Sequence, residues 1–288
     1  MKNILCTVLI LVSYLLPAQD HPILVTSDWL KKNLNEPNLA VLQVGFLKYD
    51  FDSEHIPGAQ FLWAASLAPD SPYGSFNAPD PDQATAVLQN LGVNKDSHLV
   101  LYHARNEVSI TARMFLTLEN LGLTGQVSYL NGGLEAWKKA GNEITANVLP
   151  VKKGNYKVKM GTILVDKDYV LNALKSPNRV VVDARMTRYY DGEPSGYPRN
   201  GHITGAANIP YTEMVDAENL FKPVEQLQPY FSQVAPKDKE LVTYRFIGQT
   251  ASVVYMAGRM LGYPIKLYDG SLQEWSRDES LPMEVTKK

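Results

Sequence analysis

Short apolar runs alternate with segments of helical periodicity along most of the chain. In the C-terminal half, residues 180–182, 241–244 and 265–267 form short apolar runs of the kind found in buried parallel strands. Between the last two runs, residues 250–261 place apolar side chains at helical spacing, and Gly262 marks the expected end of that helix. This strand–helix–strand order predicts parallel α/β units joined by right-handed crossovers.

The same landmarks occur twice in the chain. Residues 55–59, HIPGA, return as HITGA at 202–206, and residues 132–137, GGLEAW, return as GSLQEW at 270–275. The offset of about 140 residues is too long for a solenoid repeat, so it indicates a duplicated domain. The tryptophan that ends each copy of the second motif is expected to pack in a core.

The N-terminal segment has the layout of a secretory signal peptide. Residues 1–19 read MKNILCTVLILVSYLLPAQ, with Lys2 before an apolar run that is too short to cross a bilayer. We expect cleavage near Ala18 or Gln19, an exported protein that is periplasmic or secreted, and no membrane span in the mature chain. Cleavage would remove Cys6, which is the only cysteine, and with it any disulfide, thiolate metal site or cysteine nucleophile.

The two copies are separated by residues 145–160, which lack apolar helical spacing and contain four lysines. We therefore predict a first domain over residues 20–148, a linker over 149–160 and a second domain over 161–288. Near the start of the first domain, Ser27 or Asp28 is placed to cap a short helix.

Charge and motif content exclude several classes of function. Lys and Arg total 28 against 30 Asp and Glu, so the nearly neutral chain has no global electrostatic footprint for nucleic acid. No phosphate-binding loop, zinc-ligand spacing or Gly-x-Ser-x-Gly elbow occurs. We expect no nucleic-acid partner, no metal and no cofactor.

Together the repeated motifs carry a family resemblance. In the second half they are Asp183-Ala184-Arg185, Arg188-Tyr189, Gly201-His202-Ile203 with Gly205-Ala206, and Tyr268-Asp269-Gly270-Ser271 leading to Glu274-Trp275. With them the sequence resembles the tandem-domain rhodaneses, the thiosulfate and 3-mercaptopyruvate sulfurtransferase family, over nearly all of residues 22–282. The resemblance implies an α/β fold of two tandem rhodanese-like domains, each a mainly parallel sheet flanked by helices.

The family's chemistry depends on one cysteine at the end of a second-domain strand, in the pattern Tyr-Cys-x-x-Gly-x-x-Ala. In active members its thiolate takes the donor's outer sulfur as a persulfide and passes it to an acceptor. This sequence keeps Tyr244, Gly248 and Ala251 of that pattern but has Arg245 at the cysteine position. A guanidinium stays protonated and offers only donors, so it cannot attack sulfur or hold a persulfide. We expect no catalytic residue for cysteine-dependent transfer.

The equivalent loop of the first domain offers no substitute. It is longer, and His103 falls at the cysteine position. Gln43 and Gly45 stand where the second domain has Asp183 and Arg185. The resemblance therefore implies that the site at His103 is vestigial.

Two interpretations of the Arg245 loop remain open. The loop has decayed, with the arginine facing solvent or a carboxylate, or it forms an anion pocket, because amides at a helix start and a fork-shaped cation both suit anions. The expected ligands are thiosulfate, sulfate, sulfite or a mercaptopyruvate-like compound. The candidate pocket residues are Asp183, Arg185, Arg188, Arg245, Phe246, Ile247, Gly248, Gln249, Thr250 and Ala251. Asp183 is expected to orient loop backbone or a nearby arginine.

Two rival functions are also open. One is sulfur transfer by an unforeseen mechanism, and the other is an interaction module that binds an exported protein partner while both sites are vestigial. Among the histidines, the resemblance implies structural roles for His55 and His202 in the repeated motif. His21 and His98 are expected to be isolated surface residues.

Overall fold

The N-terminal half of the chain forms a five-stranded sheet. The computed structural model describes residues 21–70, 74–105 and 107–286. The strands run in the order β1-β5-β4-β2-β3, and every neighbouring pair is parallel. The strands are β1 (Leu24–Val25), β2 (Leu39–Gly45), β3 (Gln60–Trp63), β4 (His98–His103) and β5 (Val127–Leu130).

The C-terminal half repeats this topology. Its sheet has the order β6-β11-β10-β7-β9, again parallel throughout, so each strand has a counterpart at the same place in the first sheet. The strands are β6 (Leu164–Val165), β7 (Arg179–Asp183), β9 (Ala207–Asn208), β10 (Glu240–Tyr244) and β11 (Ile265–Tyr268). A separate antiparallel pair joins β8 (His202–Ile203) to β12 (Met283–Glu284). The predicted duplication of an α/β domain is confirmed. The strands predicted at residues 180–182, 241–244 and 265–267 are β7, β10 and β11.

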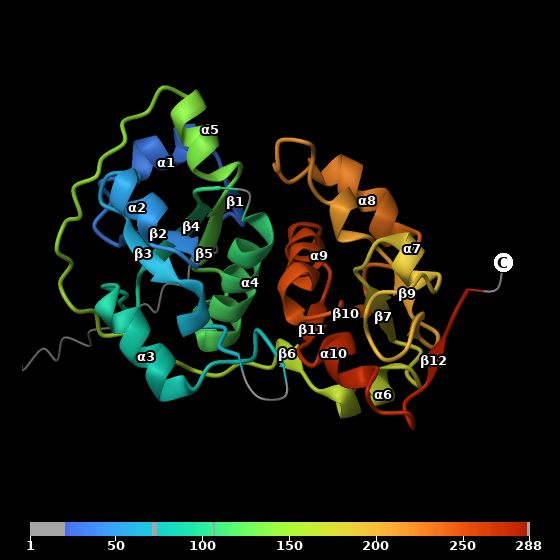
Figure 1. Cartoon of the computed structure of the whole chain (residues 1–288). Coiled ribbons are helices and arrows are strands. Elements are labelled where there is room, and N and C mark those ends of the chain that lie inside the picture. The colour runs from blue at the N-terminus through green and yellow to red at the C-terminus, as the bar shows by residue number, and fades with distance from the viewer. Residues whose placement is uncertain (1–20, 71–73, 106, 287–288) are drawn as a thin grey trace, which may run out of the picture.

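Helices cover both faces of each sheet (Figure 1). The outer faces carry helices whose apolar residues belong to separate buried clusters, one for each domain. In the first domain the helices are α1 (Ser27–Asn33), α2 (Tyr49–Ser53), α3 (Pro81–Asn90), α4 (Val108–Leu118) and α5 (Gly133–Lys139). In the second they are α6 (Lys167–Ala173), α7 (Thr187–Tyr190), α8 (Val224–Ser232), α9 (Gly248–Met260) and α10 (Ser271–Trp275). Short turns lie at η1 (Ala64–Ser66), η2 (Glu119–Leu123) and η3 (Tyr211–Glu213).

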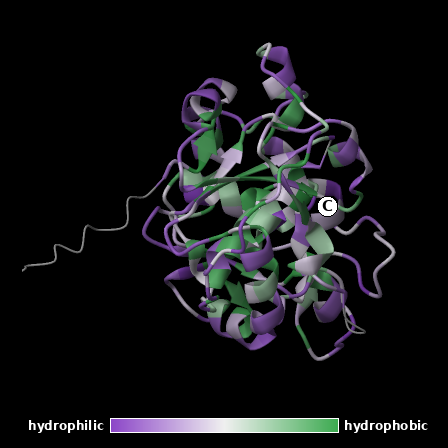
Figure 2. Cartoon of the chain, turned by 90° about the vertical axis from the view of Figure 1, so that its left-hand side faces the viewer, coloured by the Kyte–Doolittle hydropathy of each residue, from purple (hydrophilic) through white to green (hydrophobic). Residues whose placement is uncertain are grey.

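The two domains share one core through α4 and α9, which pack side by side between the sheets (Figure 1). Phe115 and Leu118 of α4 lie in the same buried cluster as Val254 and Ala257 of α9. Apolar residues concentrate in the strands and in these inner helices, while the outer loops are largely polar (Figure 2). The large shared core makes the domain arrangement part of the folded structure, because burial of apolar area is the main stabilising term.

Two details differ from the expectations drawn from the sequence. The first helix is capped by Thr26, whose Oγ1 accepts from Trp29 N at 3.2 Å, so Ser27 and Asp28 lie inside the helix. His98 is buried and stacks on His21 with ring centroids 3.6 Å apart, so neither is an isolated surface residue. The sequence pattern could not show this stack, because His21 and His98 lie far apart in the sequence and meet only in the folded domain.

The segment between the two domains has little regular structure. Residues 151–160 contain no helix or strand, and Tyr156 of this segment donates a hydrogen bond from its hydroxyl to Leu121 O at 2.8 Å. Within the described residues, none of the helices has the length and apolar character needed to cross a bilayer. The predicted signal peptide, with Cys6, lies outside the described residues.

Candidate functional site

The loop that follows β10 forms the expected turn into α9. Tyr244 ends the strand in full burial, Ile247 is extended, and the helix begins at Gly248. Two hydrogen bonds hold the loop from behind: Leu272 N donates to Arg245 O and Gln273 N donates to Phe246 O, both at 2.9 Å. The strand–loop–helix frame that the resemblance implies is therefore formed around Arg245.

Arg245 is half-buried among aromatic rings. Its Cζ lies 4.8 Å from the ring centroid of Tyr211 and 5.1 Å from that of Phe246. Nε is buried with no hydrogen-bond partner, and none of the carboxylates in the described part of the chain lies within ion-pair distance of the guanidinium. Burial lowers the pKa of Arg245, and the neighbouring Tyr211 and Asp183 partly offset this effect. The result is a partly buried cation that makes no ion pair within the described part of the chain.

Asp183 is occupied by Arg185 and is not available to Arg245. Both side chains are fully buried, and Arg185 Nε donates to both carboxylate oxygens at 3.0 Å. The Tyr244 hydroxyl donates to Asp183 Oδ2 at 2.8 Å, and Arg185 also donates to Gly201 O at 2.7 Å. Asp183 thus binds both Arg185 and the Tyr244 hydroxyl. This arrangement leaves Arg185 NH1 buried without a hydrogen-bond partner.

Phe246 brings the two arginines together. The Cζ atoms of Arg185 and Arg245 both lie 5.1 Å from the centroid of its ring. Tyr197 stacks on the ring at 5.1 Å, and Tyr189 meets it edge-on at 5.3 Å. We call these five residues the Phe246 cluster. Cation–π contacts stabilise guanidinium groups here without neutralising them.

Arg188 lies at the exposed edge of the Phe246 cluster, where it contacts Tyr189. Its side chain is exposed, donates to the Tyr189 hydroxyl at 2.9 Å and lies 3.8 Å from a carboxylate oxygen of Glu193. Two of the three arginines named from the sequence therefore share one ring, and the third lies at the surface. This separation follows from α7, which has only four residues and presents Arg188 to solvent.

The first turn of α9 faces the first domain. Gln249 Nε2 donates to Ser109 Oγ of α4 at 3.0 Å, while Thr250 and Ala251 are buried. Thr250 and Tyr211 line a recess of about 420 Å³ between the domains. No side chain caps α9, and the first amides of an α-helix have no partners within it, so this end of the helix favours an anion.

The corresponding place in the first domain is closed. His103 is buried, and its Nδ1 lies 3.0 Å from the Tyr129 hydroxyl. Burial lowers the pKa of His103 to about 4, so the ring is neutral at pH 7. The backbone of Gly133 lies against it, since a Cβ there would come within 2.4 Å of His103 O. A packed neutral imidazole gives this loop no charge with which to bind an anion.

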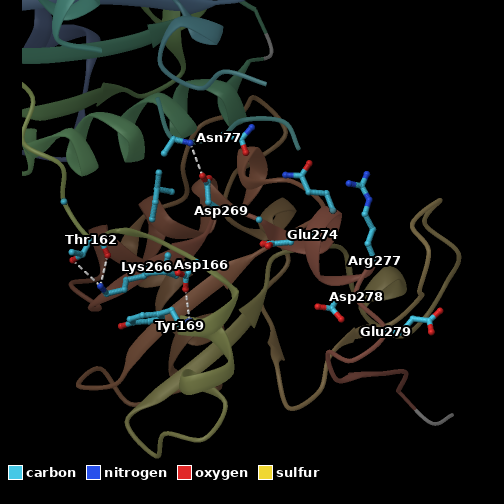
Figure 3. A pocket seen from close by; sticks show the side chains of 16 residues that line it. Asn77, Thr162, Asp166, Tyr169, Lys266, Asp269, Glu274, Arg277, Asp278 and Glu279 are labelled. Carbon is cyan, nitrogen blue, oxygen red and sulfur yellow. Dashed lines mark hydrogen bonds between the residues drawn. The ribbon is translucent and has the colours of Figure 1, made fainter. Parts of the chain in front are cut away.

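A cavity of about 1150 Å³ lies elsewhere, beside β6, β11 and α10 (Figure 3). Its charged lining consists of Asp166, Asp269, Glu274, Asp278, Glu279, Lys266 and Arg277. The excess of carboxylates makes this cavity a poor place for an anion. Within the described residues, no group of three or more His, Cys, Asp or Glu side chains could hold a metal ion.

Comparison with known proteins places this geometry in a family. The family description "Rhodanese-like domain" matches residues 26–140 and 166–278, which together make up most of the chain. The chain belongs to the rhodanese family. Both matched segments are rhodanese domains, and the tandem arrangement expected from the repeated motifs is thereby confirmed.

Several relatives of this rhodanese match along their whole length. The chain is 33% identical to a probable 3-mercaptopyruvate sulfurtransferase of Pseudomonas aeruginosa over 280 residues, covering 90% of this chain and 97% of that protein. It is 29% identical to the 3-mercaptopyruvate sulfurtransferase of Escherichia coli K12, covering 91% and 98%. The crystal structure of the 3-mercaptopyruvate sulfotransferase from Escherichia coli matches with a TM-score of 0.76 at 28% identity, over 87% of this chain and 99% of that one.

Sequence motifs did not identify every residue around Arg245. Tyr211 follows a short strand, and Tyr197 lies in a segment rich in Gly, Pro and Ser, so neither belongs to a periodic element that would predict its direction. Arg113 of α4 was also missed. Its position within an apolar helix of the first domain was the available signal, because a charged residue in such a helix needs a buried partner.

Proposed function

We propose that this rhodanese binds a small anion at Arg245 and does not carry out cysteine-dependent sulfur transfer. The observation that supports the proposal is a partly buried guanidinium, with Nε unbonded and no ion pair among the described residues, at the place where the family holds its nucleophile. A bound anion would offset the cost of burying this cation. A merely decayed loop would be expected to turn the guanidinium to solvent or pair it with a carboxylate.

The surrounding charges favour one small anion. The Asp183–Arg185 pair is neutral as a unit, so Arg245 supplies the net charge, and the uncapped start of α9 adds a partial positive charge. The aromatic rings of Tyr211 and Phe246 limit the space beside the guanidinium. Thiosulfate, sulfate, sulfite and mercaptopyruvate are the first candidates, because they are compact and the similar proteins are named for 3-mercaptopyruvate.

Calorimetry on the purified mature chain tests this proposal. We expect thiosulfate or another of the four anions to bind, and Arg245→Ala to weaken that binding by about tenfold or more, since hydrogen bonds to charged groups contribute about 1.5–3 kcal/mol. Arg188→Ala is the control, because it removes an exposed arginine that contacts Tyr189 and Glu193 instead of Phe246. Absence of binding, or equal binding by wild type and Arg245→Ala, would overturn the proposal.

We also propose that the protein is exported and loses residues 1–19. The support is the charged start, the short apolar run and the small residues that follow it. Mass spectrometry of the protein isolated from its own cells should give an N-terminus near residue 19 or 20. An intact N-terminus on the cytoplasmic fraction would contradict export.

A further inference from the structure

The main chain of the Arg245 loop is held by the segment that follows β11. Leu272 N donates to Arg245 O, and Gln273 N donates to Phe246 O, each at 2.9 Å. These bonds fix two consecutive carbonyl groups at the turn between β10 and α9. The groups that hold residues 269–273 in place therefore also determine the shape of the loop.

Those groups come from the first domain. Ala78 N donates to Asp269 Oδ2 at 3.0 Å, a contact drawn as a dashed line in Figure 3. Ser75 N donates to Gln273 Oε1 at 3.0 Å, and Gln273 Nε2 donates back to Ser75 O at 3.3 Å. Residues 75–78 of the first domain are thus bonded to both ends of segment 269–273, which supports the loop.

Arg113 of α4 adds a buried charge at the same place. Its side chain is fully buried, and NH2 lies 2.8 Å from Asp269 Oδ1. A Cβ atom on Gly248 would lie 2.5 Å from Arg113 NH1, so the guanidinium fills the space beside the first residue of α9. Among the described residues, Asp269 is the carboxylate that pairs with it. A buried arginine with a single carboxylate partner depends strongly on that partner.

We propose that Arg113 and Asp269 are positioning residues through which the first domain holds the Arg245 loop in its binding shape. Arg113 acts on the first residue of α9, and Asp269 acts on the segment that carries the two supporting amides. The first domain, whose own site is closed by His103, is thereby part of the second domain's site. The measurement of thiosulfate affinity described below rests on the proposed anion binding, whereas the measurement of amide hydrogen exchange does not.

A second interdomain ion pair, between half-buried Arg259 and buried Glu119, provides a control. Arg259 of α9 donates from NH1 to Glu119 Oε2 at 2.7 Å, and Tyr255 donates to the same oxygen at 2.6 Å. Glu119 directly follows α4, so this pair joins the same two helices at the end remote from the loop. Removing Arg259 weakens domain contact without touching residues 245–249.

The experiment compares Arg113→Met with Arg259→Met in the full chain. In Arg113→Met we expect amide hydrogen exchange at Leu272 and Gln273 to accelerate by about tenfold or more, because the bonds from these amides to the loop carbonyl groups then open locally. Thiosulfate affinity should fall by a similar factor, since a displaced loop no longer presents its guanidinium and amides. Arg259→Met should change both quantities by less than about twofold. Equal effects of the two variants, or an unchanged loop in Arg113→Met, would overturn the inference.

A second variant keeps the test decisive if Arg113→Met fails to fold. Gly248→Ala leaves every charge in place and directs a methyl group at Arg113 NH1. It should accelerate exchange at Leu272 and Gln273 when Arg113 is present and add nothing in the Arg113→Met background. Additive effects would show that Arg113 does not set the loop. If wild type binds no thiosulfate, the anion proposal fails, while the exchange data still decide this inference.

Discussion

The two domains are alike around the repeated histidine motif. His55 Nδ1 bonds Phe51 O at 2.7 Å, and His202 Nδ1 bonds Tyr190 O at 2.8 Å, with each imidazole stacked on the ring of that aromatic residue. The strand tyrosines correspond too: Ile56 N and Ile203 N each donate to a tyrosine hydroxyl from the middle strand. Duplication has preserved the packing that stabilises both sheets.

The domains differ where β2 and β7 end. Asp183 and Arg185 form a buried ion pair in the second domain, whereas Gln43 is buried with Oε1 unbonded in the first. The next strand ends at neutral His103 in one domain and leads to charged Arg245 in the other. The difference teaches that the duplicated scaffold persists where the charged residues do not, and that charge distinguishes the second domain's loop from that of the first.

Placing a cysteine in each loop should give the largest difference between the domains, measured as sulfurtransferase activity. Arg245→Cys should raise thiocyanate formation from thiosulfate and cyanide by roughly 10³-fold or more over wild type, since removing the nucleophile from a covalent enzyme typically costs about 10⁶. The loop frame and the uncapped start of α9 would stabilise the new thiolate.

The control is His103→Cys, which places a thiol in the closed loop of the first domain. We expect it to remain at the wild-type level, because the thiol would be buried beside Tyr129, and burial in apolar surroundings raises the pKa of a thiol. Equal gain in the two variants would abolish the distinction between the domains. No gain in Arg245→Cys would show that more than the nucleophile has been lost.

The ion pair at the end of β7 supplies the next contrast. Asp183→Asn should lower the free energy of unfolding by about 3–5 kcal/mol, because it leaves the fully buried Arg185 without a counter-charge. Gln43→Leu, at the equivalent strand position, should change it by less than about 1 kcal/mol, since the buried oxygen it removes has no partner. Urea unfolding measures both. A cost for Asp183→Asn no larger than that of Gln43→Leu would contradict this account.

Much of the fold follows from the sequence, and less of the site does. Periodicity and the repeated motif predict the two parallel sheets because strands and helices alternate locally, and the family pattern locates Arg245. The direction of a side chain depends on tertiary neighbours, so nothing in the sequence separates Arg188, which faces solvent, from Arg185, which is buried. The contact between Arg113 and Asp269 joins residues far apart in the chain, and no local pattern encodes it.

The smallest expected difference is in how the free energy of unfolding depends on pH in wild type and in His103→Gln. Burial lowers the pKa of His103 to about 4, whereas an unfolded histidine titrates near 6.5, so the unfolded chain binds more protons between these values. The stability linked to His103 is therefore complete above about pH 6.5 and lost as pH falls towards 4, by about 3 kcal/mol in all. His103→Gln cannot titrate, and its urea unfolding free energy should fall less steeply between pH 6.5 and 4.5 than that of wild type.

Other groups do not obscure this comparison. Burial and the neighbouring His21 lower the pKa of His98 to about 4 as well, but that histidine is present in both proteins and contributes equally to each profile. Loss of the contact with the Tyr129 hydroxyl lowers the stability of His103→Gln at every pH, so the slope carries the information. Parallel profiles for wild type and His103→Gln would mean that the imidazole takes up its proton within the folded domain, and that the first-domain site is more open than its packing indicates.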